Sequence, residues 1–171
     1  AEYDEGPTGV TVFYFPAGVI ATVDVRGGAP GTVNTDWLRL GYESRTMRAI
    51  VLSGGASHGL SAVTGVADAI RAAQVDSGGT PRIVGVAGAI VNDLGEGTGA
   101  RRFSPFTPDA KLGTAALRAA RAGRFVLGAH GAGRYVMTGT SVSEAEFSGQ
   151  GGAFRQIGPT RIAVFTIVNA G

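Results

Sequence analysis

Residues 55–59 read Gly-Ala-Ser-His-Gly and match the G-x-S-x-G pattern of the nucleophile elbow in serine hydrolases. In such an elbow, a sharp turn between a strand and a helix exposes the serine hydroxyl, which attacks a carbonyl carbon. Triad partners follow Ser57 in the usual order, namely Asp93 or Asp109 and then His130. Ser57 is therefore a candidate nucleophile. The competing interpretation is that Ser57 caps the following helix and that the glycines form a tight turn.

The same glycines suggest a second chemistry. Gly54 and Gly55 lead into a predicted helix start, where backbone amides favour anions. However, the Gly-Lys-Ser/Thr continuation of a phosphate loop is missing. The loop at residues 26–32, Arg-Gly-Gly-Ala-Pro-Gly-Thr, offers the same suggestion more weakly. A non-catalytic module that binds anions is therefore a hypothesis of a different class.

Polar residues also follow predicted strands. Asn169 comes directly after Ile167 and Val168, and Asn92 and Asp93 end another apolar segment. A carboxamide at such a strand end can donate a hydrogen bond to a developing oxyanion, or it can simply close a turn. The residue types alone leave both roles open for Asn169.

Composition excludes several classes of function. The chain has no cysteine and two histidines, His58 and His130, which argues against thiol catalysis and a histidine-rich metal site. The formal net charge is +2 and the arginines are scattered, so we expect no nucleic-acid partner. No apolar run approaches the ~20 residues of a membrane span, so we expect no membrane partner. The sequence begins at Ala1 without a charged-then-apolar leader, so we expect a cytoplasmic protein, the alternative being a mature chain from which a leader was removed.

The elements that must position these residues follow from apolar patterning. Residues 10–15 and 19–25 flank Pro16-Ala17-Gly18 and predict a hairpin. Further strands are predicted at residues 49–52, 124–127 and 160–168, and residues 82–91 predict one strand or a strand pair broken by glycine.

Two helices complete the pattern. Leu60, Val63, Ala67 and Ile70 recur at helical spacing and form one apolar stripe. An alanine-rich helix is predicted over residues 109–122, between a preceding proline and a glycine stop. Strands and amphipathic helices together predict an α/β layered fold, with residues 1–171 as a single domain. Because the chain ends just after an apolar strand, we expect it to be a portion of a larger protein.

Three segments, residues 6–32, 50–60 and 148–170, together resemble the large chain of the L-aminopeptidase/D-esterase family, and especially its branch that hydrolyses 6-aminohexanoate (nylon) oligomers. The resemblance rests on Gly-Pro-Thr-Gly near the start, the Val-Asp-x-Arg-Gly-Gly-Ala loop and the Gly-Gln-Gly-Gly-Ala-Phe-Arg segment. It implies an α-β-β-α sandwich of N-terminal-nucleophile hydrolase type and a precursor that cleaves itself. The new N-terminal Ser or Thr of a separate small chain would be the nucleophile, with its own amino group as base. The resemblance further implies a tetramer of heterodimers without metal or cofactor.

The resemblance also suggests site residues. It implies that Asn169 stabilises the oxyanion, and it places Asn92 at a catalytic position often held by tyrosine. Thr140 stands where a lysine is common, and His58 takes an aromatic position in the glycine loop, so both are expected to bind substrate. Ser57 would then cap and pack, and would not attack.

The expected activity is hydrolysis of linear amides such as 6-aminohexanoate oligomers. The alternative within the family is an aminopeptidase acting on short peptides or β-peptides.

Overall fold

The main sheet has the strand order β1-β2-β4-β5-β3, and its central strands β4 (Thr46–Ser53) and β5 (Gly85–Ile90) are parallel. Helix α1 (Ser61–Asp76) makes the crossover between them. The other pairings are antiparallel and involve β1 (Glu2–Tyr3), β2 (Thr8–Ile20) and β3 (Thr32–Val33). This computed structural model describes residues 1–28, 31–41, 46–80, 82–94, 105–139 and 145–168.

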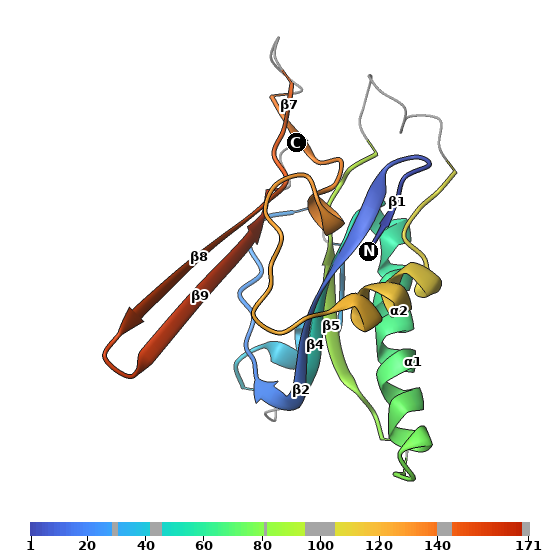
Figure 1. Cartoon of the computed structure of the whole chain (residues 1–171), viewed down its shortest axis with the longest axis vertical. Helices are drawn as coiled ribbons and strands as arrows, with labels where there is room; N and C mark the ends of the chain where they lie inside the picture. The colour runs from blue at the N-terminus through green and yellow to red at the C-terminus, as the bar shows by residue number, and fades with distance from the viewer. Residues whose placement is uncertain (29–30, 42–45, 81, 95–104, 140–144, 169–171) are drawn as a thin grey trace.

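Helices α1 and α2 (Ala110–Ala119) cover one face of the sheet (Figure 1). Val63, Val66 and Ile70 of α1 are buried against strand residues such as Val51, because they recur on one side of the helix. The helices approach closely where Gly113 meets the backbone of Ala62, since a Cβ at Gly113 would overlap the carbonyl oxygen of Ala62.

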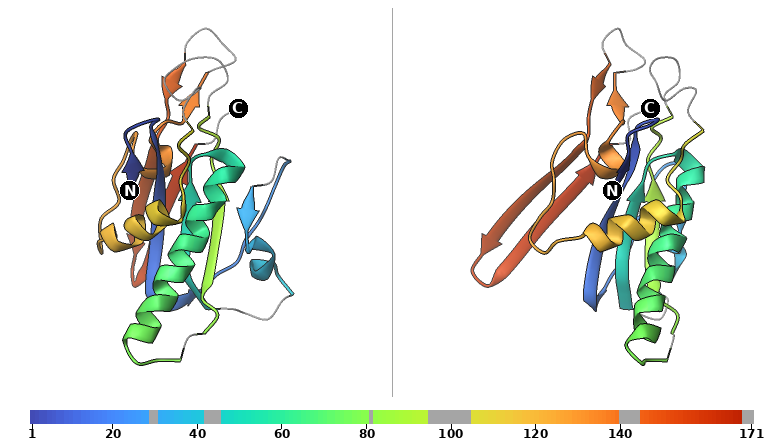
Figure 2. Two further views of the ribbon diagram at one scale, coloured as in Figure 1. Left: turned by 90° about the vertical axis from the view of Figure 1, so that its right-hand side faces the viewer. Right: turned by 45° about the vertical axis from the view of Figure 1, so that its right-hand side comes forward.

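Strands β8 (Gln150–Ile157) and β9 (Thr160–Ile167) form a hairpin (Figures 1 and 2). The hairpin lies on one side of the main sheet, and the helices lie on the other. Phe13 of β2 packs against Phe165 of β9 and against Phe125 of the preceding segment. The ring centroids of these three residues lie 4.7 to 5.7 Å apart. A two-stranded sheet, β6 (Met137–Thr138) with β7 (Glu146–Phe147), lies near the C-terminal end of β9. The short 3₁₀ helices η1 (Thr35–Leu38), η2 (Ala56–Leu60) and η4 (Gly131–Gly133) complete the described elements.

The predicted hairpin at residues 10–25 is wrong. Residues 8–20 form one strand, and both halves pair with β4, Tyr14 opposite Ala49 and Val19 opposite Met47. Pro16-Ala17-Gly18 forms a bulge between these pairs, where the missing proline amide costs no ladder bond and Gly18 takes φ +79°.

The strands predicted at residues 49–52, 82–91 and 160–168 are confirmed as β4, β5 and β9, and both helices are present. The strand predicted at residues 124–127 is wrong, because this segment is irregular and joins β8 only through the Gly128–Gln150 bridge. Strand β8 was missed because Gly151 and Gly152 weaken its strand signal. Helix α2 ends at Ala119, earlier than predicted, since Ala120 already has an extended ψ of 137°.

Candidate active site

A small apolar cluster joins segments that are distant in sequence. Val91, Ala132 and Val136 are buried in it, and Leu52 and Ile167 pack against them. These residues come from β4, the segment after β5, the region of η4 and β6, and the end of β9. The cluster therefore brings the ends of both sheets together.

Each segment of this cluster continues toward one of the predicted site residues. Along the chain, Val91 precedes Asn92, Leu52 precedes His58, Val136 precedes Thr140, and Ile167 precedes Asn169. Asn169 and Thr140 themselves lie outside the described residues, so the structure gives no geometry for them. The convergence of the four segments marks this end of the molecule as the candidate active site.

Ser148 links two of the same segments. Its hydroxyl lies 3.2 Å from the carbonyl oxygen of Val136 and 3.4 Å from that of Val168, and its amide donates to Val136 at 2.9 Å. The end of β9 is therefore tied to the strand that leads toward residue 140. No local pattern signals this role, because a serine between Phe147 and Gly149 is typical of any turn.

Asn92 lies at the surface between two buried residues, Val91 and Asp93. Its side-chain oxygen accepts a hydrogen bond from the Leu94 amide at 3.3 Å. Because side chains alternate along extended backbone, the burial of both neighbours directs Asn92 outward. Asn92 is thus exposed at the edge of the apolar cluster.

His58 and Ser57 are also exposed, and both lie in η2. Neither η2 nor α1 has a side-chain hydrogen bond at its N-cap, and these caps are Gly55 and Leu60. The prediction that Ser57 caps the helix and packs is therefore wrong. The turn depends on Gly55, whose φ of +83° is left-handed and strained for other residues.

The glycine turn already holds an anion, the buried carboxylate of Asp93. Its Oδ1 accepts from the Gly55 amide at 2.6 Å, and its Oδ2 accepts from the Thr8 hydroxyl at 2.6 Å. The flanking amides are also used, since Gly54 donates to Gly9 and Ala56 donates to Val91. The phosphate-loop hypothesis for this turn is therefore wrong, because these three amides are paired within the chain.

The triad proposed for Ser57 is not assembled. His130 Nδ1 lies 3.3 Å from the Glu2 carboxylate, and Asp93 is engaged as described above. Asp109 caps α2 by accepting from the Leu112 amide at 2.8 Å, and it accepts from the Tyr3 hydroxyl at 2.8 Å. The Ser57 elbow hypothesis thus loses its acid and its base.

The environment of Asp109 perturbs two pKa values. Burial raises the pKa of Tyr3, and its hydrogen bond to the Asp109 carboxylate adds to the effect. Burial acts to raise the pKa of Asp109, but hydrogen bonds from Leu112 and Tyr3, together with Lys111, lower it below its usual value. These perturbations accompany a helix cap, so they have a structural cause.

Gln150 is a buried polar residue that sequence reasoning missed. Its side chain accepts from the Thr11 hydroxyl at 2.9 Å and donates to the Val126 carbonyl oxygen. Thr11 in turn accepts from the Ala132 amide at 3.0 Å. Gln150 therefore fixes the start of the β8–β9 hairpin to β2 and to the loop before η4. The available signal was a glutamine between glycines at a strand start.

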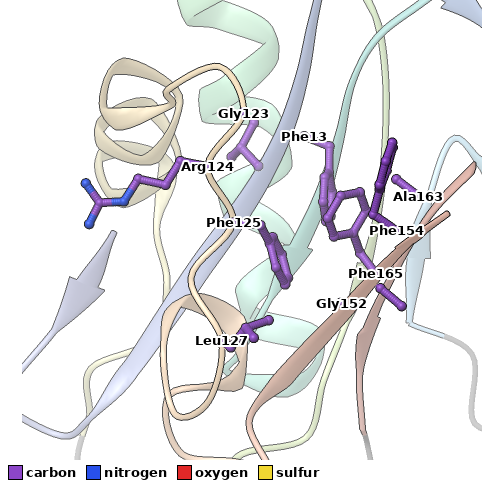
Figure 3. A pocket seen from close by; sticks show the side chains of 11 residues that line it. Phe13, Gly123, Arg124, Phe125, Leu127, Gly152, Phe154, Ala163 and Phe165 are labelled. Carbon is purple, nitrogen blue, oxygen red and sulfur yellow. The ribbon is translucent and has the colours of Figure 1, made fainter. Parts of the chain in front are cut away.

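A pocket lies on the side of the sheet that faces the hairpin. A cavity of about 550 Å³ opens between β2, residues 123–127 and the hairpin, with Phe13, Phe125 and Phe165 in its wall (Figure 3). Arg124 points away from these rings. Neither Asn92 nor His58 lines this pocket. Its labelled side chains are apolar except for Arg124, so it is mainly an apolar surface between the sheet and the hairpin.

Within the described ranges, no three His, Asp or Glu side chains are grouped as metal ligands would be. The same part of the chain contains no helix with the length and apolarity that crossing a bilayer requires.

Comparisons with known proteins identify relatives of this chain. The 6-aminohexanoate-oligomer endohydrolase of Paenarthrobacter ureafaciens is 39% identical over 170 residues, which are 99% of this chain and 44% of that protein. An uncharacterized aminopeptidase of Mycobacterium tuberculosis is 42% identical over 90 residues, covering 50% of this chain and 25% of that protein. A solved Burkholderia sp. beta-aminopeptidase shares the fold with a TM-score of 0.66 and 22% identity, covering 100% of this chain and 48% of that chain.

The chain therefore spans less than half the length of these proteins. The model of peptidase family S58 matches residues 2–171, nearly the whole chain. The chain belongs to peptidase family S58.

Proposed function

We propose that the whole protein is an amide hydrolase of N-terminal-nucleophile type, and that residues 1–171 are a single domain forming a portion of its large chain. The observation that carries this proposal is the convergence of the segments leading to Asn92, His58, Thr140 and Asn169 on one apolar cluster. In this proposal, self-cleavage of a precursor releases a small chain that begins with the nucleophilic Ser or Thr.

The proposed mechanism assigns each group one step. The small chain's hydroxyl attacks the amide carbonyl carbon while its α-amino group takes the proton. The Asn169 carboxamide donates a hydrogen bond to the oxyanion, which is stronger in the tetrahedral state than in the ground state. The amine then leaves with a proton, and water hydrolyses the acyl-enzyme. Asn92 contributes a second polar group to the catalytic site.

Thr140 and His58 are proposed to contact the substrate. Thr140 is uncharged where a lysine is common in the family, so it offers hydrogen bonding without a fixed positive charge. His58 presents an exposed ring at the glycine turn. Such a site suits an uncharged amide in an extended apolar chain.

We further propose that the hairpin belongs to the second sheet of an α-β-β-α sandwich. Its outer face presents Ile157, Ile162 and Val164, which are 60%, 49% and 57% exposed. A two-stranded hairpin with apolar residues on its open face is marginally stable alone, so further strands must cover it. The small chain is the proposed source of those strands, within a cytoplasmic tetramer of heterodimers.

Two substrate classes compete within this proposal. The relative of Paenarthrobacter ureafaciens, similar along 99% of the chain, favours 6-aminohexanoate oligomers. The mycobacterial relative and the Burkholderia structure are named as aminopeptidases and favour short peptides or β-peptides. The longer similarity makes linear 6-aminohexanoate amides the leading choice.

The test is turnover by the purified full-length protein. A 6-aminohexanoate trimer and tetramer, a short α-peptide and a β-peptide are supplied at equal concentration, and released amines are identified by mass spectrometry. Cleavage of the 6-aminohexanoate oligomers supports the leading choice, and cleavage of peptides alone favours the alternative. If no amide is cleaved, the proposed function is wrong.

A further inference from the structure

Asp93 is the most enclosed carboxylate among the described residues, and the mechanism proposed above does not use it. The residue is 2% exposed. Removing a carboxylate from water is costly unless it is paired or hydrogen-bonded, so a buried Asp requires compensation. Its two short hydrogen bonds, from the Gly55 amide and the Thr8 hydroxyl, supply that compensation.

The surroundings of Asp93 leave no spare space. A Cβ on Gly54 would overlap both the Asp93 carboxylate and the Thr8 hydroxyl. Thr8 is itself completely buried. The carboxylate is thus seated between the start of β2 and the glycine turn, where neither can shift independently.

The same carboxylate fixes its own segment. Val91 donates to the carbonyl oxygen of Ser53 at 2.8 Å, and Ala56 donates to that of Val91 at 3.2 Å. With the Asp93 bonds, these contacts hold residues 91–93 in extended register beside the turn. Asn92, between the two buried residues, is thereby directed outward.

We propose that Asp93 is a positioning residue of the active site: by clamping the glycine turn to β2 and holding residues 91–93 beside it, Asp93 sets the direction of Asn92. It does not touch substrate. The activity measurements below rest on the proposed function, whereas the spectroscopic measurement does not.

The test is a double-mutant cycle in the full-length, self-cleaved protein. Asp93→Ala leaves the Gly55 amide without its acceptor, and the resulting misplacement of Asn92 is expected to lower kcat on the order of 10²-fold, with KM little changed. In an Asn92→Ala background, the same change is expected to lower kcat by less than about threefold, because the group being positioned is gone. Equal losses in both backgrounds would overturn the proposal.

Two further variants separate positioning from folding. In Asp93→Asn, the amide oxygen can accept from Gly55 and the amide nitrogen can donate to the Thr8 hydroxyl, so most of the lost kcat should return. Asp109→Ala is the matched control, because it also removes a hydrogen-bonded aspartate, but one that caps α2. It should keep kcat within about twofold at a temperature where the variant is folded. Comparable loss in Asp109→Ala, or no rescue by Asn, would contradict the proposal.

A third measurement does not depend on activity. It tests the positioning role even if a variant fails to self-cleave or the wild type has no turnover. Nuclear magnetic resonance of the isotope-labelled protein follows the Asn92 side-chain amide and exchange of the Gly55 amide with solvent. In Asp93→Ala, the Asn92 signals should shift and the Gly55 amide should exchange faster, whereas Asp109→Ala should change neither. Unchanged Asn92 signals would refute positioning. An inactive wild type would refute only the proposed function.

Discussion

The Gly55 amide donates to the Asp93 carboxylate at 2.6 Å, so the turn after β4 is bound by a side chain from the end of β5. This contact gives the glycine turn a positional role and leaves no vacant anion site at its amides. It also joins the turn that carries His58 to the segment that carries Asn92. The first prediction follows from how tightly this junction is packed.

Gly54→Ala should destabilise the protein by about 1–3 kcal/mol, because the added methyl group must displace the Asp93 carboxylate or the Thr8 hydroxyl. Chemical denaturation of the full-length protein measures the change. Gly28→Ala is the control, since a Cβ there meets nothing within 4 Å. Equal stability of the two variants would show that the Asp93 carboxylate and the Thr8 hydroxyl can move aside at little cost, against this prediction.

Asp109→Ala should cost about 1 kcal/mol at neutral pH through loss of the α2 cap. Because the folded-state pKa of Asp109 is lowered, its charge contributes stability above its unfolded pKa of about 4, and this contribution disappears as pH falls through the folded-state value. The stability gap between wild type and variant should therefore be full at pH 6 and shrink below about pH 4. Urea titrations at both pH values check this, and a gap that widens in acid would contradict it.

Gln150→Leu should destabilise the protein by about 1–3 kcal/mol, since it removes the hydrogen bond that the buried Gln150 side chain donates to the Val126 carbonyl oxygen. The Thr11 hydroxyl also loses its acceptor. Thermal unfolding compared with Gln74→Leu tests this, because the Gln74 side chain accepts a hydrogen bond from the exposed Arg82 amide. Similar melting temperatures for both variants would argue against an anchoring role for Gln150.

The sequence predicted the helices and the buried strands well because their apolar residues recur with a clear period. It failed at Pro16-Ala17-Gly18, since a proline and a glycine between two strands look the same in a turn and in a bulge. The difference lies in pairing with β4, which is a long-range contact. Local patterns also could not show that Asp93, Gln150 and Ser148 bind distant backbone groups, because each partner is far away along the chain.

The predicted site divides in the same way. Asn92 and His58 are exposed and their roles stay predictions, whereas Ser57 has neither a cap nor its triad. The G-x-S-x-G pattern reflects the backbone demands of the turn at Gly55. Thr140 and Asn169 stay predictions.

Asn169→Ala should reduce kcat by about 10²–10³-fold, because it removes a donor to the oxyanion. Ser57→Ala, its comparison, should leave kcat nearly unchanged, since Ser57 lacks an assembled triad. Steady-state kinetics on the best amide substrate, with self-cleavage verified for each variant, gives the ratio. The reverse pattern would restore Ser57 as the nucleophile.

The central claim is that the attacking hydroxyl belongs to a second chain made by self-cleavage. Intact-mass measurement and N-terminal sequencing of the purified, active full-length protein test it most directly. The account predicts two chains, the smaller beginning with Ser or Thr. A single uncleaved chain that hydrolyses amides would contradict it.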